Sequence, residues 1–276
     1  MQIRYENSPQ ETAAMNTEAL RQNFLIETLF QAGQVQLVYT HYDRMVIGGV
    51  VPNAAPIDLP NHEALKAEFF LERREMGVIN IGGAGQVTVD KKTFALQKLD
   101  CLYIGRGAVE VQFSSLDSQN PAQFFLLSAP AHASFPNTLK TAAEADPAHM
   151  GASETANKRT IYKYIHPDGV ASCQLVMGLT VLENGSVWNT MPAHTHDRRM
   201  EVYCYFDVAE GQRVLHLMGQ PQETRPLWIS NHQAIISPPW SIHAGCGTMA
   251  YAFIWGMAGE NQSFGDMDFI APDDLR

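Results

Sequence analysis

The sequence predicts an all-β protein with two similar β-domains and one short N-terminal helix. Most of the chain consists of short apolar runs separated by Gly, Asn and Asp, a pattern typical of strands and turns. Helical periodicity is clear in one segment near the start. Two blocks of the first half recur in the second half, which indicates two copies of one β-sandwich or barrel.

The helix is expected over Thr17 to Gln31. In "TEALRQNFLIETLFQ", Leu20, Phe24 and Leu25 recur at helical spacing behind Thr17, a residue type that caps helices. Strand-like runs follow, so residues 1–35 are predicted to form an arm and a helix.

Two strand-rich parts follow the helix. The first predicted domain covers residues 36–131, with runs such as "MGVINIGGAG" and "CLYIGRGAVEVQF". Residues 132–158 are polar and rich in Ala and Pro, so they are expected to connect the domains and to carry a helical turn. Strands resume with "RTIYKYI", and the second predicted domain covers residues 159–276.

The internal repeat supports this division. Glu72 to Gly85 aligns with Asp197 to Gly211, and each block has an acidic residue, two arginines, an apolar strand and a turn with Gly. Leu102 to Val111 aligns with Ile235 to Ala244 in the same order and at comparable spacing. Chance similarity between strands is the alternative, but the shared order favours a duplicated fold.

Composition excludes several classes of partner. The net charge is −10 and no run of Lys or Arg is present, so nucleic acid and anionic membranes are not expected to bind. No apolar run could span a bilayer, and the first residues do not form a signal peptide. The four cysteines are far apart and form no CxxC pair, which favours a reducing, cytoplasmic location.

A candidate metal site lies in "MPAHTHDRRMEVYCYF". His194 and His196 are two residues apart, so on a strand both side chains point to one face. Glu201 has the opposite parity and joins them only if "DRRM" reverses the chain. His243, in "SPPWSIHAG", is the fourth candidate ligand. Three imidazoles and one carboxylate suit a borderline divalent cation with open coordination positions.

A His-x-His pair alone is more often an accident than a metal site. The carboxylate, the strand context and the later histidine favour the metal interpretation here. The remaining histidines lack such spacing and are expected at the surface or in the core, although His41 and His216 could line a cavity.

These residues resemble the two motifs of the cupin family. The usual glycine stands six residues before the first histidine, whereas Gly185 stands nine before His194, and the second motif lacks its usual Asn. Five blocks spread over most of the chain resemble more closely the 5-keto-4-deoxyuronate isomerase family of pectin breakdown: "FFLERREMGVINIGGAG", "NTMPAHTHDRRMEVY", "MGQPQETRP", "SPPWSIHAG" and "FIWGMAGENQ".

This resemblance implies a bicupin, that is, two jelly-roll barrels, with similar members being hexamers. It implies one Zn²⁺ per subunit, held by His194, His196, Glu201 and His243, the set that the spacing also indicates. The first copy has no matching ligands and is therefore expected to be structural, contributing core and oligomer contacts. The implied activity is a ketol-isomerase that converts 5-dehydro-4-deoxy-D-glucuronate to 3-deoxy-D-glycero-2,5-hexodiulosonate through an enediol.

Such a reaction needs a base and a group that binds the substrate carboxylate. Glu223, a loop carboxylate in "GQPQETRP", is the candidate base, with a solvated turn as the alternative. Tyr203 is expected to pack in the barrel or to hydrogen-bond the substrate. The candidate carboxylate-binding residues are Arg159, Lys163 and Arg225; Arg198 and Arg199 recur in the first copy as Arg73 and Arg74 and are therefore expected to be structural.

Two other functions remain open at this level. Three histidines and a carboxylate also suit Fe(II), so a metal-dependent cupin dioxygenase is the first alternative. A non-catalytic sugar-acid sensor is the second, although no DNA-binding helix-turn-helix pattern is present.

Overall fold

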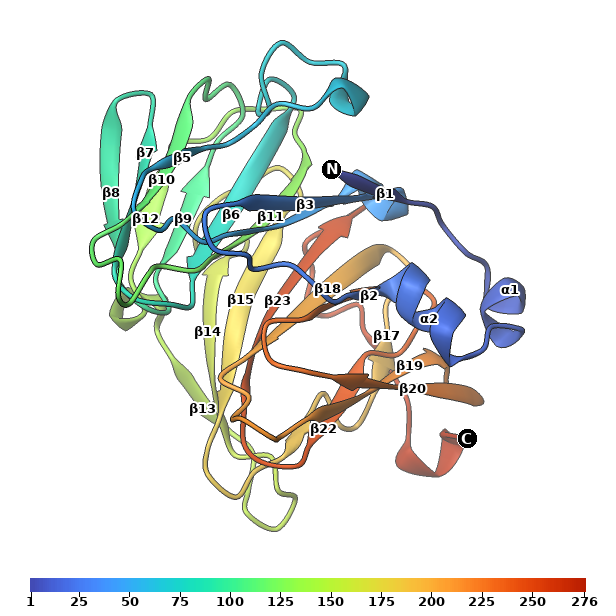
Figure 1. The fold of residues 1–276 in the computed structure, drawn as a ribbon. Helices are drawn as coiled ribbons and strands as arrows, with labels where there is room; N and C mark the ends of the chain where they lie inside the picture. Colours follow the sequence, from blue (N-terminus) through green and yellow to red (C-terminus); the bar gives the residue numbers. More distant parts are fainter. The chain divides into compact units, whose positions relative to one another are not determined.

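The computed structural model describes all residues from Met1 to Arg276 and is mostly β, which confirms the all-β class. The chain forms two compact units (Figure 1). The first unit contains Met1–Arg4, Thr28–Asp146 and Lys163–Met177. The second unit contains Tyr5–Glu27, Pro147–Tyr162 and Gly178–Arg276.

The units therefore differ from the continuous ranges suggested by the sequence. The residues of the predicted arm are shared between both units, and so are those of the predicted connection at 132–158. Pairing causes this at the N-terminus, because Gln2–Arg4 joins a strand of the first unit while Leu25–Ile26 joins a strand of the second. Composition does not reveal such distant pairing partners.

The first unit has two sheets. A seven-stranded sheet has the order β1-β3-β4-β11-β6-β9-β12, and a four-stranded sheet has the order β5-β10-β7-β8. The strands are β1 (Gln2–Arg4), β3 (Val35–Thr40), β4 (Val46–Val50), β5 (Ile57–Asp58), β6 (Arg74–Asn80), β7 (Gly85–Val89), β8 (Lys92–Leu96), β9 (Cys101–Ile104), β10 (Val111–Ser115), β11 (Phe124–Pro130) and β12 (Thr138–Lys140). Short 3-10 turns are η1 (Tyr42–Arg44), η2 (Glu63–Leu65) and η3 (Ala143–Ala145).

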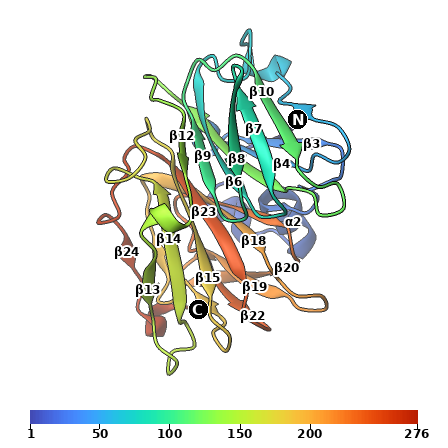
Figure 2. The ribbon, with the colours of Figure 1, turned by 90° about the vertical axis from the view of Figure 1, so that its left-hand side faces the viewer.

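The second unit carries sheets of the same sizes, with the orders β13-β14-β15-β23-β18-β21-β2 and β16-β22-β19-β20, and a small sheet of β17 and β24. Figure 2 shows β14, β15 and β23 side by side. The elements are α1 (Pro9–Ala13), α2 (Thr17–Phe24), β2 (Leu25–Ile26), β13 (Ala148–Met150), β14 (Arg159–Ile165), β15 (Val176–Leu182), β16 (Trp188–Asn189), β17 (His194–Thr195), β18 (Arg199–Phe206), β19 (Val214–Gln220), β20 (Glu223–Ile229), β21 (Ala234–Ser237), β22 (Ala244–Gly247), β23 (Ala252–Gly259), β24 (Asp268–Phe269) and η4 (Pro272–Asp274). Residues Lys163–Met177 belong to the first unit. They include the end of β14, the start of β15 and the connection between them.

The two strand orders correspond. In each large sheet the central strand (β11 or β23) is paired with the strand that follows the repeated acidic-Arg-Arg sequence (β6 or β18). In each small sheet a hairpin (β7–β8 or β19–β20) is paired with one further strand (β10 or β22). This order agrees with the internal repeat seen in the sequence.

The helical prediction was wrong in extent. Helix α2 ends at Phe24 because Leu25 and Ile26 pair with β21. Its cap is Asn16, whose side chain accepts a hydrogen bond from the Ala19 backbone N–H at 2.9 Å. Tertiary pairing overrides the helical periodicity that continues beyond Phe24.

A second helix, α1, was not predicted. Ser8 and Glu11 form a reciprocal capping box at its start, and the pattern "SPQE" carries that signal. The helical turn expected in residues 132–158 is confirmed as η3, but β12 and β13 in the same range were not predicted. None of the helices is long and apolar enough to cross a membrane.

The interiors of the two units differ in polarity. A large apolar cluster fills the first unit, with Val78, Val87 and Phe113 among its members. In the second unit, the buried residues of β18 and β19 include Glu201, Tyr203, Tyr205 and His216. Buried polar groups cost free energy unless they are paired, so this group of ionisable side chains points to a functional site in the second unit.

Candidate metal centre

A tight reversal brings Glu201 beside the two histidines. Strand β17 contains His194, and the His196 carbonyl accepts a hydrogen bond from the Arg199 N–H at 3.0 Å, which closes the turn through Asp197 and Arg198. Strand β18 begins at Arg199, so Glu201 is its third residue. The predicted reversal in "DRRM" is therefore confirmed, and it resets the parity that an unbroken strand would impose.

The fourth side chain comes from a distant part of the chain. His243 lies immediately before β22 and follows a turn in which the Ser241 N–H donates a hydrogen bond to the Pro238 carbonyl. His194, His196, Glu201 and His243 are all at least nine-tenths buried. One ligand atom from each lies within 4.8 Å of the others.

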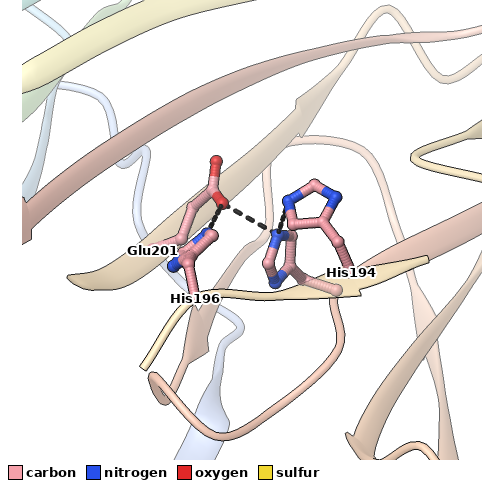
Figure 3. Close-up of side chains that lie close together, drawn as sticks. His194, His196 and Glu201 are labelled. Atoms are coloured by element: carbon pink, nitrogen blue, oxygen red, sulfur yellow. Dashed lines mark hydrogen bonds and ion pairs between the residues drawn. The ribbon is translucent and has the colours of Figure 1, made fainter. Parts of the chain in front are cut away.

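The contacts among these four side chains are short. Glu201 Oε2 lies 3.0 Å from His196 Nε2 and 2.9 Å from His243 Nε2. His243 Nε2 also lies 3.0 Å from His194 Nε2. Figure 3 shows the side chains of His194, His196 and Glu201 directed toward one another. Three nitrogen atoms and one oxygen atom therefore face a common point.

The opposite ring nitrogens fix the tautomers. His196 Nδ1 lies 2.8 Å from the Arg199 carbonyl, and His243 Nδ1 lies 3.3 Å from the Ser241 carbonyl. A carbonyl only accepts, so each Nδ1 carries a proton, and Nε2 is the ring nitrogen left to bind a metal ion. Both Nε2 atoms lie against a carboxylate oxygen, so either a proton or a metal ion must lie between them. A divalent metal meets this requirement, and the donor set fits one.

Charge and burial oppose one another at Glu201 and at His196. Burial would raise the pKa of Glu201, but His243 and His196 outweigh it and hold that pKa below its ordinary value. Burial and the neighbouring His243 lower the pKa of His194 to about 3, so its ring is neutral. Burial also lowers the pKa of His196, but the Glu201 carboxylate reverses this and raises it. The cluster thus keeps an ionised carboxylate and attracts positive charge.

The C-terminal segment supports the two strands that carry the ligands. Strand β24 pairs with β17, with Phe269 opposite His194. Arg199, which is fully buried, forms an ion pair with Asp266 at 2.7 Å, and Arg198 pairs with both Asp266 and Asp268. The expectation that these two arginines are structural agrees with these contacts.

Polar side chains continue inward from the metal cluster. The Tyr203 ring lies edge-on to His243, with centroids 5.5 Å apart, and its hydroxyl lies 2.8 Å from Thr190 Oγ1. Farther in, Tyr205 Oη lies 2.7 Å from His216 Nδ1. His216 is fully buried, and its Nε2 has no hydrogen-bond partner.

From the sequence, His216 lacks the spacing of a metal ligand and is expected at the surface, in the core or along a cavity. The alternation in "RVLHLMG" puts it on the inner face of β19 with Val214 and Met218, and this signal could have identified it. Burial and the nearby His243 lower the pKa of His216 to about 3, so the ring is neutral.

The other predicted site residues lie in different places. Arg159 is half-buried at the start of β14; burial lowers its pKa, and Tyr203 partly offsets this. Lys163 is exposed farther along β14, in the part grouped with the first unit. Arg225 donates to the backbone carbonyls of Thr12, Ala13 and Met15.

Glu223 is exposed at the start of β20 and lines a narrow pocket with Arg225 and residues of α1. No hydrogen bond, ion pair or ring contact connects Glu223 or Arg225 to the four-residue cluster. The structure thus brings together the four candidate ligands and Tyr203, with Arg159 nearby, and leaves Glu223 and Arg225 apart.

Comparisons with solved structures show what the fold is similar to. A solved iolB-like protein from Salmonella typhimurium superimposes with a TM-score of 0.74 at 17% identity, covering 90% of this chain and 97% of that one. A Bacillus subtilis oxalate decarboxylase gives a TM-score of 0.59 at 12% identity over 87% of this chain and 78% of its own. At these identities the similarity shows the fold alone, a mostly β architecture with cupin-like neighbours.

Sequence relatives are much closer. A protein of Shouchella clausii is 56% identical over 276 residues, and one of Halalkalibacterium halodurans is 55% identical, each over the full length of both chains. A Formosa agariphila protein is 52% identical over 99% of this chain and 98% of its own. All three bear the name 4-deoxy-L-threo-5-hexosulose-uronate ketol-isomerase. Together with a match over residues 24–271, these identities show that the chain belongs to the KduI/IolB family.

Proposed function

We propose that this protein is a 4-deoxy-L-threo-5-hexosulose-uronate ketol-isomerase whose metal is held by His194, His196, Glu201 and His243. The observation that carries the proposal is the convergence of four buried ligand atoms within 4.8 Å, in a chain 56% identical over its full length to a protein of that name. Zn²⁺ is the proposed metal because nitrogen-rich sites with one carboxylate suit it. We also retain the bicupin description, the role in pectin breakdown and the hexamer as parts of this proposal.

The reaction is an internal redox exchange with no net change in composition. A proton leaves the carbon that bears the hydroxyl group and is returned to the neighbouring carbonyl carbon, while the hydroxyl proton moves between the two oxygens through an enediol. When bound, the metal would act as a Lewis acid for those oxygens. The chain's own residues must orient the substrate, hold its carboxylate and move the protons.

Several side chains are suited to these tasks. The imidazoles around Glu201 lower its pKa, which makes it a weak base, and we propose that it serves as a ligand. The Tyr203 hydroxyl lies beside the cluster and can donate a hydrogen bond to a substrate oxygen. Arg159 is half-buried at the start of β14, and we propose that it binds the substrate carboxylate.

The distance of a side chain from the cluster decides whether it can act as the general base. A general base must come within hydrogen-bond distance of the proton that it removes. Glu223 is exposed and has no contact with the cluster, so the geometry favours residues of the barrel interior over Glu223. Arg225 is less suited than Arg159 to bind the substrate carboxylate, because it already bonds to three backbone carbonyls. Lys163 is less suited because it is exposed in the part of β14 that is grouped with the first unit.

A combined measurement of metal content and turnover tests the function. The wild type, a His194→Ala/His196→Ala variant and a His149→Ala control, which alters an exposed histidine, would be compared. Bound metals would be determined, and isomerisation would be assayed with enzymatically prepared substrate. We expect stoichiometric zinc and turnover in the wild type and the control, and neither in the double variant.

Two results would redirect the assignment. A wild type that binds metal, consumes oxygen and leaves the substrate unisomerised would support a dioxygenase. A wild type that binds the substrate with metal present but never turns it over would support a sensor. The cytoplasmic location remains part of the proposal, supported by four cysteines that are all free thiols.

A further inference from the structure

A second candidate ligand site lies in the first unit, which the sequence suggested to be purely structural. A pocket of about 250 Å³ is lined by Arg44, Arg73 and Arg74, by the aromatic rings of Tyr39 and Phe70, and by no acidic residue. We call it the arginine pocket. Three cations around one pocket are unexpected in a chain whose net charge is −10.

Arg74 is buried without a counter-charge. It is 7% exposed, and its guanidinium donates to Ser128 Oγ at 3.1 Å and to the carbonyls of Ser128 and Arg44, each at 2.6 Å. These acceptors are neutral, Nη1 has no partner, and no carboxylate lies within ion-pair distance. A buried charge that is hydrogen-bonded but not neutralised is costly, and an anion that enters the pocket would remove this cost.

The internal repeat supplies a comparison. Arg74 is the first residue of β6, and Arg199 is the first residue of β18. Arg199 is also buried, but Asp266 lies 2.7 Å from its guanidinium. The second unit thus provides a carboxylate for this arginine, whereas the first unit leaves a pocket beside Arg74.

Further donors around the pocket have no partner in the chain. The exposed guanidinium of Arg44 and the hydroxyl of Tyr39 make no hydrogen bond or ion pair. Arg73 bonds through Nη2 to the carbonyls of Leu65 and Lys66, which leaves its Nε and Nη1 available. Arg44 and Arg73 therefore present unpartnered cationic donors to the pocket, and the aromatic rings of Tyr39 and Phe70 also line it.

We infer that the arginine pocket binds a small carboxylate of the sugar-acid class, at a site separate from the four-residue metal cluster. Arginine presents paired N–H groups that match a carboxylate, and the Tyr39 and Phe70 rings can pack against the C–H face of a sugar. The volume is close to that of small-molecule pockets and too small for a polymer. The choice of a sugar acid over other carboxylates rests on the proposed function.

The test uses D-glucuronate as the probe and calorimetry on the full-length protein. The His194→Ala/His196→Ala variant serves as background, so that binding at the metal cluster does not contribute. We expect one D-glucuronate per chain, no binding of D-glucose, and at least about tenfold weaker binding in Arg44→Gln and Tyr39→Phe. Arg213→Gln, which changes an exposed arginine of the second unit, is the matched control and should bind as before.

Four outcomes would overturn the inference. D-glucuronate that does not bind in this background leaves no site, and binding that is insensitive to both substitutions places the site elsewhere. Tighter binding of inorganic phosphate than of D-glucuronate would exclude the sugar-acid class. If the Arg44→Gln substitution changed the oligomer size in sedimentation while no probe bound, the pocket would accept an acidic side chain of a second copy. Failure of the proposed function differs from all of these, because it appears as absent turnover in the wild type.

Discussion

The Nε2 atom of His243 lies 3.0 Å from the Nε2 atom of His194, although 49 residues separate them. His243 Nδ1 already faces the Ser241 carbonyl, so Nε2 is the ring nitrogen that meets His194. Such a contact holds either a shared proton or a common cation. The Glu201 carboxylate, 2.9 Å from the same nitrogen, favours a cation with more than one charge.

Replacing His243 by Ala should therefore remove metal and turnover together. We expect the affinity for zinc to fall by at least about a hundredfold and the activity to fall by a similar or larger factor, since even partners of a ligand cost about 10–100-fold. Zinc competition with a chromophoric chelator and the isomerase assay would measure both. His149→Ala is the control, and a His243→Ala variant with wild-type zinc affinity would contradict the assigned ligand set.

Asp266→Asn should destabilise the protein near neutral pH, because it removes the carboxylate that neutralises buried Arg199. Asp266 is partly exposed at its outer edge, so the expected loss is modest, about 1–2 kcal/mol in the free energy of unfolding. Urea unfolding would measure it, with the exposed Asp273→Asn as the control. An Asp266→Asn variant as stable as the wild type at pH 7 would show that Asn261 alone satisfies Arg199.

The same pair predicts a pH dependence. Burial raises the pKa of Asp266, but hydrogen bonds from Asn261 and Arg199 outweigh it and lower that pKa to about 2, from 3.8 in an unfolded chain. The stabilisation is therefore fully present above pH 3.8 and is lost as the pH falls through about 2. The stability difference between wild type and Asp266→Asn should shrink between pH 5 and pH 3; a constant difference over that range would contradict the assignment.

The contact between Tyr205 and His216 should contribute a measurable coupling energy. Tyr205→Phe leaves a buried nitrogen of His216 without its partner, and we expect a loss of about 1–3 kcal/mol in the free energy of unfolding. A double-mutant cycle with His216→Leu should give a coupling of about 1 kcal/mol. The cycle of Tyr162→Phe with His216→Leu should be additive, and equal coupling in both cycles would rule out a specific Tyr205–His216 bond.

Glu75 is predicted to anchor a backbone segment of the first unit. Its fully buried carboxylate accepts hydrogen bonds from the N–H groups of Cys173, Gln174 and Leu175 and from the Tyr103 hydroxyl, at 2.7–2.9 Å. Glu75→Gln replaces one acceptor by a donor, so we expect a loss of about 2–3 kcal/mol. Thermal and urea unfolding would measure the effect, with the exposed Glu110→Gln as the control; two variants of equal stability would refute the anchoring role.

The four-residue cluster was the part of the site most accessible from the sequence. The two-residue spacing of His194 and His196 and the polar turn before Glu201 are local features, and local geometry decides which way those side chains point. His216 was missed as a member of the polar interior because its partners, Tyr205 and Tyr203, lie on a different sheet. Alternation on β19 shows only that it faces inward.

Long-range pairing explains the remaining differences. Helix α2 stops at Phe24 because a strand of the second unit takes the next two residues, and the helical pattern does not reveal that competition. The sequence suggests Glu223 as the base because a carboxylate in a loop has no packing role. Glu223 lies at the turn of the β19–β20 hairpin, and whether that turn points toward the cluster depends on the sheet that contains the hairpin.

The sequence by itself determined the all-β class, the duplication and the residues able to bind a metal, because each of these follows from spacing and residue type within short segments. Only the tertiary structure decided that His243 meets His194, that Asp266 neutralises Arg199 and that Arg74 has no such partner. These relationships join residues that are distant along the chain, and their energies depend on burial and on charge separation. Neither quantity exists until the sheets have formed.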